Sequence, residues 1–191
     1  MTDNGGFTIS GVPATTYGVT LMYGPNQPML PNTKDRVAEV LGRVGSLFIS
    51  SDVGSKSFSL PCQFRDCETA SELDALIKTL AHALVDINGR AKHLSLIFDD
   101  SPTLTYTVRY SGQISFDRKW VGCTDFALDL IADDPLGYEE ETETEATITG
   151  DPESMLVYSS GNVSTPAIVK IENTGAATVS GFELKTTIEV K

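Results

Sequence analysis

One segment of this sequence constrains the fold more than any other, because it carries the start, the length and the apolar face of a helix. Thr69 and Glu72 have the spacing of a capping box, in which each side chain accepts a hydrogen bond from an amide of the first turn. Apolar side chains then recur every three or four residues along one stripe: Leu73, Leu76, Ile77, Leu80 and Leu84. Asn88-Gly89 tolerates positive φ and predicts a turn after the stripe. We expect an amphipathic helix of about 17 residues, roughly 25 Å long, that covers one face of a small sheet.

The sequence on both sides of this helix has the pattern of short strands separated by turns. Alternation of larger and smaller side chains between 17 and 23 is typical of a half-buried strand, and several later runs are similar. The expected strands are 17–23, 37–41, 47–50, 55–64, 94–98, 104–110, 113–116 and 121–131. Turns such as Ser111-Gly112 between neighbouring runs favour hairpins and antiparallel pairing. The predicted fold class is α+β, mainly β: an antiparallel β-sandwich-like N-terminal domain with one packed amphipathic helix.

A change of composition near residues 133–138 divides the chain, because glutamate-rich sequence follows it. We predict an N-terminal domain over 1–138 and a C-terminal β domain over 139–191. Further short strands are expected at 142–149, 155–158, 166–173 and 179–190. With about 50 residues, the second domain is small for independent folding, since the buried fraction falls with chain length. We expect it to be incomplete, or to lean on the first domain or on a neighbouring subunit.

The charge of the chain limits its partners. Its 26 acidic and 14 basic residues give a net charge of −12, which repels phosphate backbones and disfavours specific nucleic-acid binding. The same charge is compatible with a surface along which DNA slides without binding. No apolar run reaches the roughly 20 residues of a membrane-spanning helix, and residues 1–6 lack the start of a signal peptide. We expect a protein without membrane contact that is made in a cytoplasm.

Residue types that carry enzyme chemistry do not occur here in a catalytic pattern. The two histidines, His82 and His93, are too few for a zinc site without further ligands at suitable spacing. Motifs of nucleotide-binding loops and of serine hydrolases are absent. The acid pairs 99–100 and 133–134 lie in predicted turns, where short carboxylates bond backbone amides. We predict no enzyme activity, no cofactor and no metal, with a hydrolase as the weakest alternative.

The three cysteines are an odd number and contain no C-x-x-C pair. We expect Cys62, Cys67 and Cys123 to be reduced and mostly buried small side chains. A Cys62–Cys67 bridge is the alternative.

An acidic tract follows the predicted domain boundary. Glu139, Glu141, Glu143 and Glu145 alternate with other residues, so a strand here would place four carboxylates on one face. Such a strand is either a solvated edge that prevents aggregation or an acidic wall that faces a DNA channel.

Several segments, taken in order, resemble the distal tail proteins of long-tailed phages with flexible tails. They resemble that family's opening strand, its G-R-x-G turn, its helix and hairpin, the D-P-x-x-Y that closes its first domain, and the start of its second, galectin-like sandwich. The segments are 7–12, 41–47, 71–84, 96–100 with Tyr106, 134–138 and 161–168. Their shared order over nearly the whole chain carries the resemblance.

The resemblance implies a virion protein of the tail tip that closes a six-membered ring, with a peripheral C-terminal domain. Such a homohexamer joins the tail tube to the tip or baseplate and lets DNA pass without binding it. Expected partners are the tail-tube protein, a tip or fibre hub protein and the tape-measure protein, with assembly in the host cytoplasm. The family's second domain normally runs well past Lys191, so we expect either a truncated chain or a reduced outer domain here.

The expected subunit interface includes three segments: the proline-rich loop 24–32, the turn and strand 43–48, and the acidic tract. The candidate residues of the first two are Pro25, Pro28, Pro31, Arg43, Gly45, Leu47 and Phe48. A tail-tube or tail-terminator subunit is the alternative; a tube subunit should show a long hairpin loop. A carbohydrate-binding β-sandwich is a further alternative, although after residue 138 only Tyr158 and Phe182 are aromatic.

Overall fold

A computed structural model gives the fold of the chain. It describes residues 6–22, 27–42, 44–65, 67–120, 123–148, 157, 161–163, 168–178, 181 and 183. The chain divides into two compact units, Met1–Thr142 and Glu143–Lys191. The predicted boundary between residues 138 and 139 stays a prediction, because a division by contacts does not test whether the second unit folds by itself.

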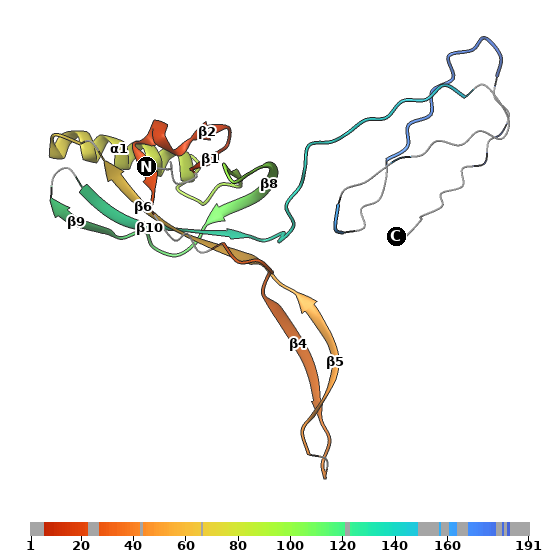
Figure 1. The fold of residues 1–191 in the computed structure, drawn as a ribbon, viewed down its shortest axis with the longest axis horizontal. Coiled ribbons are helices and arrows are strands. Elements are labelled where there is room, and N and C mark those ends of the chain that lie inside the picture. Colours follow the sequence, from red (N-terminus) through yellow and green to blue (C-terminus); the bar gives the residue numbers. More distant parts are fainter. Residues whose placement is uncertain are drawn as a thin grey trace. The chain divides into compact units, whose positions relative to one another are not determined.

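The first unit contains an antiparallel sheet (Figure 1). Within the described residues it has eight strands in the order β2-β1-β7-β8-β10-β6-β3, and β9 pairs with β10. The strands are β1 (Phe7–Ile9), β2 (Val12–Pro13), β3 (Val19–Leu21), β6 (Lys56–Arg65), β7 (Leu94–Phe98), β8 (Ser101–Tyr110), β9 (Phe116–Trp120) and β10 (Cys123–Ala132). The pairing of β6 with β10 extends over ten residues, from Arg65 opposite Cys123 to Lys56 opposite Ala132. The prediction of a mainly β fold with antiparallel pairing and one helix is confirmed.

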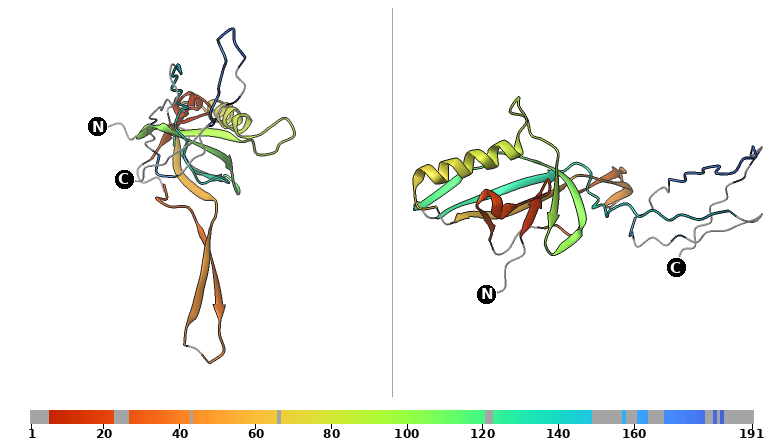
Figure 2. Two further views of the ribbon diagram at one scale, coloured as in Figure 1. Left: turned by 90° about the vertical axis from the view of Figure 1, so that its right-hand side faces the viewer. Right: turned by 90° about the horizontal axis from the view of Figure 1, so that it is seen from above.

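Helix α1 (Ala70–Leu84) lies along one face of this sheet (Figure 2). Its buried residues Leu73, Leu80 and Leu84 join the core cluster formed by the inward side chains of the strands. Phe64 of β6 stacks on Phe126 of β10 with ring centroids 4.8 Å apart, and both rings belong to this cluster. Each such buried side chain contributes roughly 1.5–3 kcal/mol of hydrophobic stabilisation.

The predicted start of the helix is confirmed. Thr69 Oγ1 accepts a hydrogen bond from the Glu72 amide at 3.2 Å, and Glu72 Oε2 accepts one from the Thr69 amide at 3.2 Å. The predicted turn at Asn88-Gly89 is also confirmed, with Gly89 at φ 75°. Asp86 stabilises this turn, because its Oδ1 accepts from the amides of Asn88 and Arg90, each at 2.8 Å.

The predicted strand over 17–23 is wrong in its first part. Residues Ala14–Tyr17 form a 3-10 helix, which ends at Gly18 with φ 68°. This left-handed conformation interrupts any strand, so β3 begins only at Val19. Apolar alternation alone does not reveal that a glycine in the pattern adopts positive φ.

A second, two-stranded sheet projects away from the first (Figure 1). It consists of β4 (Thr33–Glu39) and β5 (Ser46–Val53), and we call residues 33–53 the hairpin arm. The predicted strands 37–41 and 47–50 lie in it, but the arm is longer because polar residues at its base also pair, from Thr33 opposite Val53 to Arg36 opposite Ser50. At the base, the Gly54 amide donates to Asn32 O at 2.7 Å.

The predicted strands of the second unit are not found where the structure describes it. Residues 142–148, 157, 168–173, 181 and 183 have no strand conformation, and the other residues of these predictions lie outside the described part. The acidic tract does not form the strand considered for it, since residues 139–148 belong to no strand. Like charges on one face repel each other, and no neighbouring strand among the described residues pairs with this segment.

Candidate assembly surface

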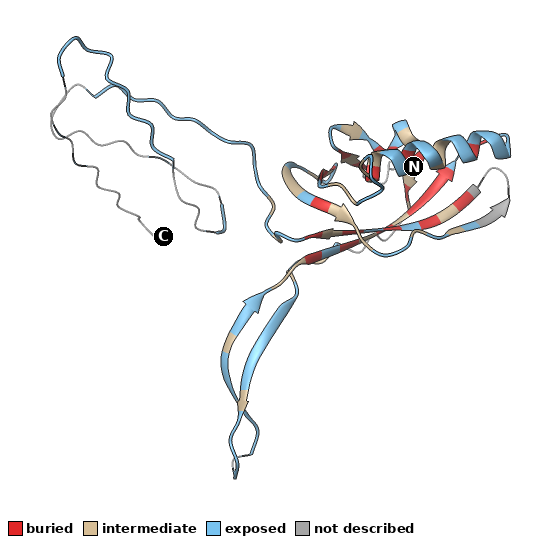
Figure 3. Ribbon diagram, turned by 180° about the vertical axis from the view of Figure 1, so that it is seen from behind, coloured by how far each residue is buried: buried red, intermediate tan, exposed pale blue. Residues whose placement is uncertain are grey.

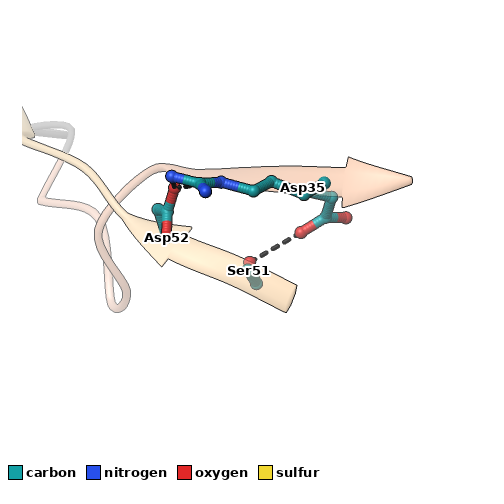
Figure 4. A network of polar contacts seen from close by, with 4 residues as sticks. Asp35, Ser51 and Asp52 are labelled. Carbon is teal, nitrogen blue, oxygen red and sulfur yellow. Dashed lines mark hydrogen bonds and ion pairs between the residues drawn. The ribbon is translucent and has the colours of Figure 1, made fainter. Parts of the chain in front are cut away.

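The base of the hairpin arm is polar. Arg36 donates to Asp52 Oδ2 from Nη2 at 2.7 Å and from Nε at 2.9 Å. Ser51 Oγ donates to Asp35 Oδ1 at 2.6 Å across the two strands (Figure 4). The Arg36 and Asp52 side chains are 67% and 51% exposed, so solvent screens this ion pair and it adds little stability.

The distal half of the arm is apolar and exposed. A register shift between Arg36 and Val37 separates it from the polar base, and beyond this shift Val37 pairs with Phe48. The exposed apolar residues of this half are Val37, Val40, Leu41, Val44, Leu47, Phe48 and Ile49, and Val53 is exposed at the base. Phe48 is 60% exposed, and Leu41 and Val44 at the tip are fully exposed.

This arm has little support from the rest of its own chain. Figure 3 shows it exposed along nearly its whole length, whereas the strands of the main sheet are buried in part. A single two-stranded hairpin is at best marginally stable in water. Contiguous exposed apolar surface marks a site of protein contact. The arm therefore has the character of a surface that is completed by another molecule.

The structure places the predicted interface residues in two adjoining regions. Leu47 and Phe48 lie in β5, and Gly45 lies at the arm tip with φ 86°. Pro28 and Pro31 are half-buried in the loop that leads into β4, which confirms a loop over the described residues 27–32. Pro25 and Arg43 lie outside the described residues. Whether any of these residues contacts a neighbouring subunit stays a prediction.

Sequence reasoning missed most of the apolar arm. Val37, Val40, Leu41 and Ile49 lie in the expected strands 37–41 and 47–50 but are not among the expected contact residues. Val44 lies inside the expected contact segment 43–48 but is not named there as a contact residue. A usable pattern existed, because apolar side chains occur at consecutive positions 47–49 and around the tip. A strand with only one buried face would show alternation there.

The D-P-x-x-Y motif holds the chain where it leaves the main sheet. Asp134 Oδ1 accepts from the Leu136 amide at 3.1 Å, and its Oδ2 accepts from the Tyr138 hydroxyl at 2.6 Å. This hydrogen bond to a carboxylate raises the pKa of Tyr138. The backbone of Tyr138 also pairs with Thr105 of β8, with N–O distances of 2.8 and 2.9 Å. Residues 134–138 therefore fix the start of the acidic segment.

The acidic residues that follow are all exposed. Glu139, Glu141, Glu143 and Glu145 lie in a segment without strand pairing, so the structure does not give them one common face. Their position along a DNA channel stays a prediction.

The described part of the chain offers no evident reaction centre. Within it, no three or more histidine, cysteine, aspartate or glutamate side chains are grouped as a metal site would require. Cys62 and Cys67 are buried and are not joined by a disulfide, which excludes the alternative of a Cys62–Cys67 bridge in this structure. Burial raises the pKa of Cys62 to about 12, so its thiol stays protonated and unreactive. Among the described residues no helix has the length and apolar character needed to cross a bilayer.

Comparison with known proteins identifies the first unit. The family model for the phage tail protein RIFT-related domain matches residues 13–132. Among solved structures that match is the crystal structure of the SPP1 Dit (gp 19.1) protein, described as a paradigm of the hub adsorption apparatus in phages that infect Gram-positive bacteria. The two share 18% identity and superpose with a TM-score of 0.61 over 72% of this chain and 53% of that one. The chain thus spans about half the length of the Dit protein, and at this identity the likeness concerns the fold. No curated protein matches the sequence.

Proposed function

The chain belongs to the family of phage tail proteins with a RIFT-related domain, and from this premise we propose that it is a distal tail protein whose copies form a ring of six. The ring connects the tail tube to the tip or baseplate, and DNA passes through its centre. The protein works by assembly and not by catalysis. Its place is the tail tip of the virion, after assembly in the host cytoplasm.

The exposed apolar arm is the observation that carries this proposal. A fold with the Dit topology and an arm that its own chain leaves uncovered is suited to packing each arm on the next copy. Such a contact is head-to-tail, and it closes when the rotation between neighbours completes a ring. Burying side chains such as Phe48 and Ile49 contributes roughly 1.5–3 kcal/mol each. Several of them together suffice to hold neighbouring copies.

The remaining partners follow from the position of such a ring. One face meets the tail-tube protein, and the other meets a tip or fibre hub protein; the tape-measure protein ends nearby. The net charge of −12 supports passage of DNA without binding, because like charges repel.

The mass of the assembly tests this proposal. We expect light scattering and native mass spectrometry to give about six times the 20.5 kDa of one chain, and electron images to show rings with a central channel. The double variant Leu41→Ser/Val44→Ser should be monomeric with unchanged thermal unfolding of the monomer, because both side chains are fully exposed in the single chain. Ile87→Ser is the matched control, since Ile87 is equally exposed but lies outside the arm. A wild-type protein that stays monomeric at high concentration contradicts the proposal.

A tail-tube or tail-terminator subunit is the second candidate, and the long hairpin favours it, since this is a feature expected of tube subunits. The likeness to the Dit fold favours the distal position instead. Electron images separate the two: tube subunits stack into long cylinders, whereas a distal ring stops at closed rings.

A further inference from the structure

A buried lysine lies at one end of the core. Lys56, the first residue of β6, is only 8% exposed and pairs with Ala132 of β10. Its Nζ lies 4.8 Å from the ring centroid of Tyr106 and 5.4 Å from that of Phe58. Both distances permit cation–π attraction.

The ammonium group of Lys56 is not satisfied by these rings alone. It carries three N–H donors, and within the part of the chain that the structure describes it makes no hydrogen bond and no ion pair. Among the described residues, Thr124 Oγ1 is a fully buried polar atom without a partner and Lys56 Nζ is not, so water still reaches the ammonium group. A carboxylate that takes the place of this water forms a charge-assisted hydrogen bond with it.

Space for such an acceptor exists beside the lysine. Lys56 lines a hollow of about 230 Å³ together with Phe58, Phe98, Ser101, Tyr106 and residues 27–29. This hollow is smaller than the roughly 300–1,000 Å³ of sites for small-molecule ligands, and it suits a single side chain. The aromatic rings that line the hollow favour a short apolar side chain, and the Lys56 ammonium favours an anionic group at its end. A glutamate side chain has this composition.

The chain itself supplies the glutamate. Five of its 26 acidic residues lie within the exposed segment 139–145. In the same copy, Glu139 and Glu140 line a different hollow, beside Thr105 of β8. Thr105 and Tyr106 are consecutive in a strand and point to opposite faces, so these two residues start on the far side of β8 from Lys56.

We propose that the hollow around Lys56 receives a glutamate side chain from the acidic segment 139–145 of a second copy. The contact is a charge-assisted hydrogen bond between a carboxylate and the Lys56 ammonium, enclosed by Phe58 and Tyr106. This proposal rests on the proposed function, because it requires that copies of the chain associate. It adds a polar contact, which orients neighbouring copies, to the apolar contact made by the hairpin arm.

A peptide of residues 138–146 tests this contact on the full-length protein by titration calorimetry. We expect saturable binding at one site, lost by at least about tenfold in Lys56→Met, as for removal of a charge-assisted hydrogen bond. Lys78→Met is the matched control, because Lys78 is exposed on α1, and it should bind the peptide as the wild type does. Amide resonances of Phe58 and Tyr106 should shift on binding.

A second peptide, in which all five glutamates are glutamine, keeps the test decisive if Lys56→Met does not fold. It should not bind the wild-type protein. Equal binding of both peptides overturns the proposal, and so does equal binding by Lys56→Met and wild type, or no binding of the acidic peptide. All these titrations are made on full-length chains that also carry Leu41→Ser/Val44→Ser, with or without the change at position 56 or 78, so that the protein is monomeric and no neighbouring copy fills the hollow. A failure of the wild type to form rings is seen separately in the mass measurement.

Discussion

Arg109 and Asp133 form a two-pronged ion pair where β10 ends. Arg109 donates from Nε to Asp133 Oδ2 at 2.8 Å and from Nη2 to Oδ1 at 3.0 Å. The pair joins β8 to the first residue after β10, next to the D-P-x-x-Y segment. It therefore ties down the chain just before the acidic segment begins.

This ion pair predicts a pH-dependent contribution to stability. The hydrogen bonds and charge of Arg109 lower the pKa of Asp133 below its ordinary value. A lowered pKa in the folded state means stability that is present above the ordinary aspartate pKa and is lost as the pH falls through the folded value. Asp133→Asn should lower Tm at pH 7 by a few degrees at most, because the pair is exposed.

Thermal unfolding between pH 7 and pH 2 checks this prediction. The difference in Tm between wild type and Asp133→Asn should narrow below about pH 4 and disappear near pH 2. A constant difference over this range would show that the carboxylate charge does not matter.

Among the glycines that the structure describes, Gly18 should be the least tolerant of alanine. It has φ 68°, and a Cβ placed on it would lie 2.6 Å from Leu76 Cδ1 of α1. Gly18→Ala should lower the free energy of unfolding by roughly 2–4 kcal/mol, from the left-handed backbone and the steric overlap together. Gly89→Ala is the control: its φ is 75° but nothing lies within 4 Å of the new Cβ, so only about 1 kcal/mol is expected. Urea titrations compare the two.

The capping box of α1 should contribute measurably to stability. Thr69→Ala removes the hydroxyl that accepts from the Glu72 amide, and a loss of about 1 kcal/mol is expected. Thr79→Ala is the control within the same helix, because the Thr79 hydroxyl bonds only to Ala75 O and alanine has the better helix propensity. Denaturant unfolding should show no loss for this control; equal losses for both variants would argue against a capping effect.

The Cys62 thiol should be unreactive in the folded protein. Its pKa of about 12 leaves almost no thiolate at pH 8. Iodoacetamide should therefore label Cys62 only after unfolding, as read by mass spectrometry of the peptide that contains it. Rapid labelling of this residue in native buffer would show that the core opens locally.

The parts of the fold that sequence predicts well are those whose determinants are local. The helix start needs only Thr69, Glu72 and the stripe that follows, all within a few turns of one another. The length of the hairpin arm could not be predicted, because the polar pairs at its base carry no apolar periodicity. The acidic segment has the alternating pattern of a strand but does not form one. Alternation predicts which side chains would share a face, but a strand also needs a neighbouring strand to pair with.

The burial of Lys56 could not be predicted from the sequence, because it depends on residues far away in the chain. A lysine at a strand start is ordinarily solvent-exposed. Its burial depends on Tyr106, fifty positions later in the chain, and on Phe98, which contacts Phe58 with ring centroids 5.7 Å apart. Only the pairing of β6 with β10 and of β10 with β8 brings these elements to one end of the sheet.

The hairpin arm also has a consequence for the time between synthesis and assembly. Within the described residues, β4 and β5 pair only with each other, so a free subunit presents two open strand edges beside exposed apolar side chains. Open edges of this kind template pairing with any other extended chain, and they drive aggregation. Unassembled subunits are thus a hazard that rises with their concentration. If subunits enter the assembly as fast as they are translated, the concentration of free chains stays low. Less of the protein is then lost to aggregation.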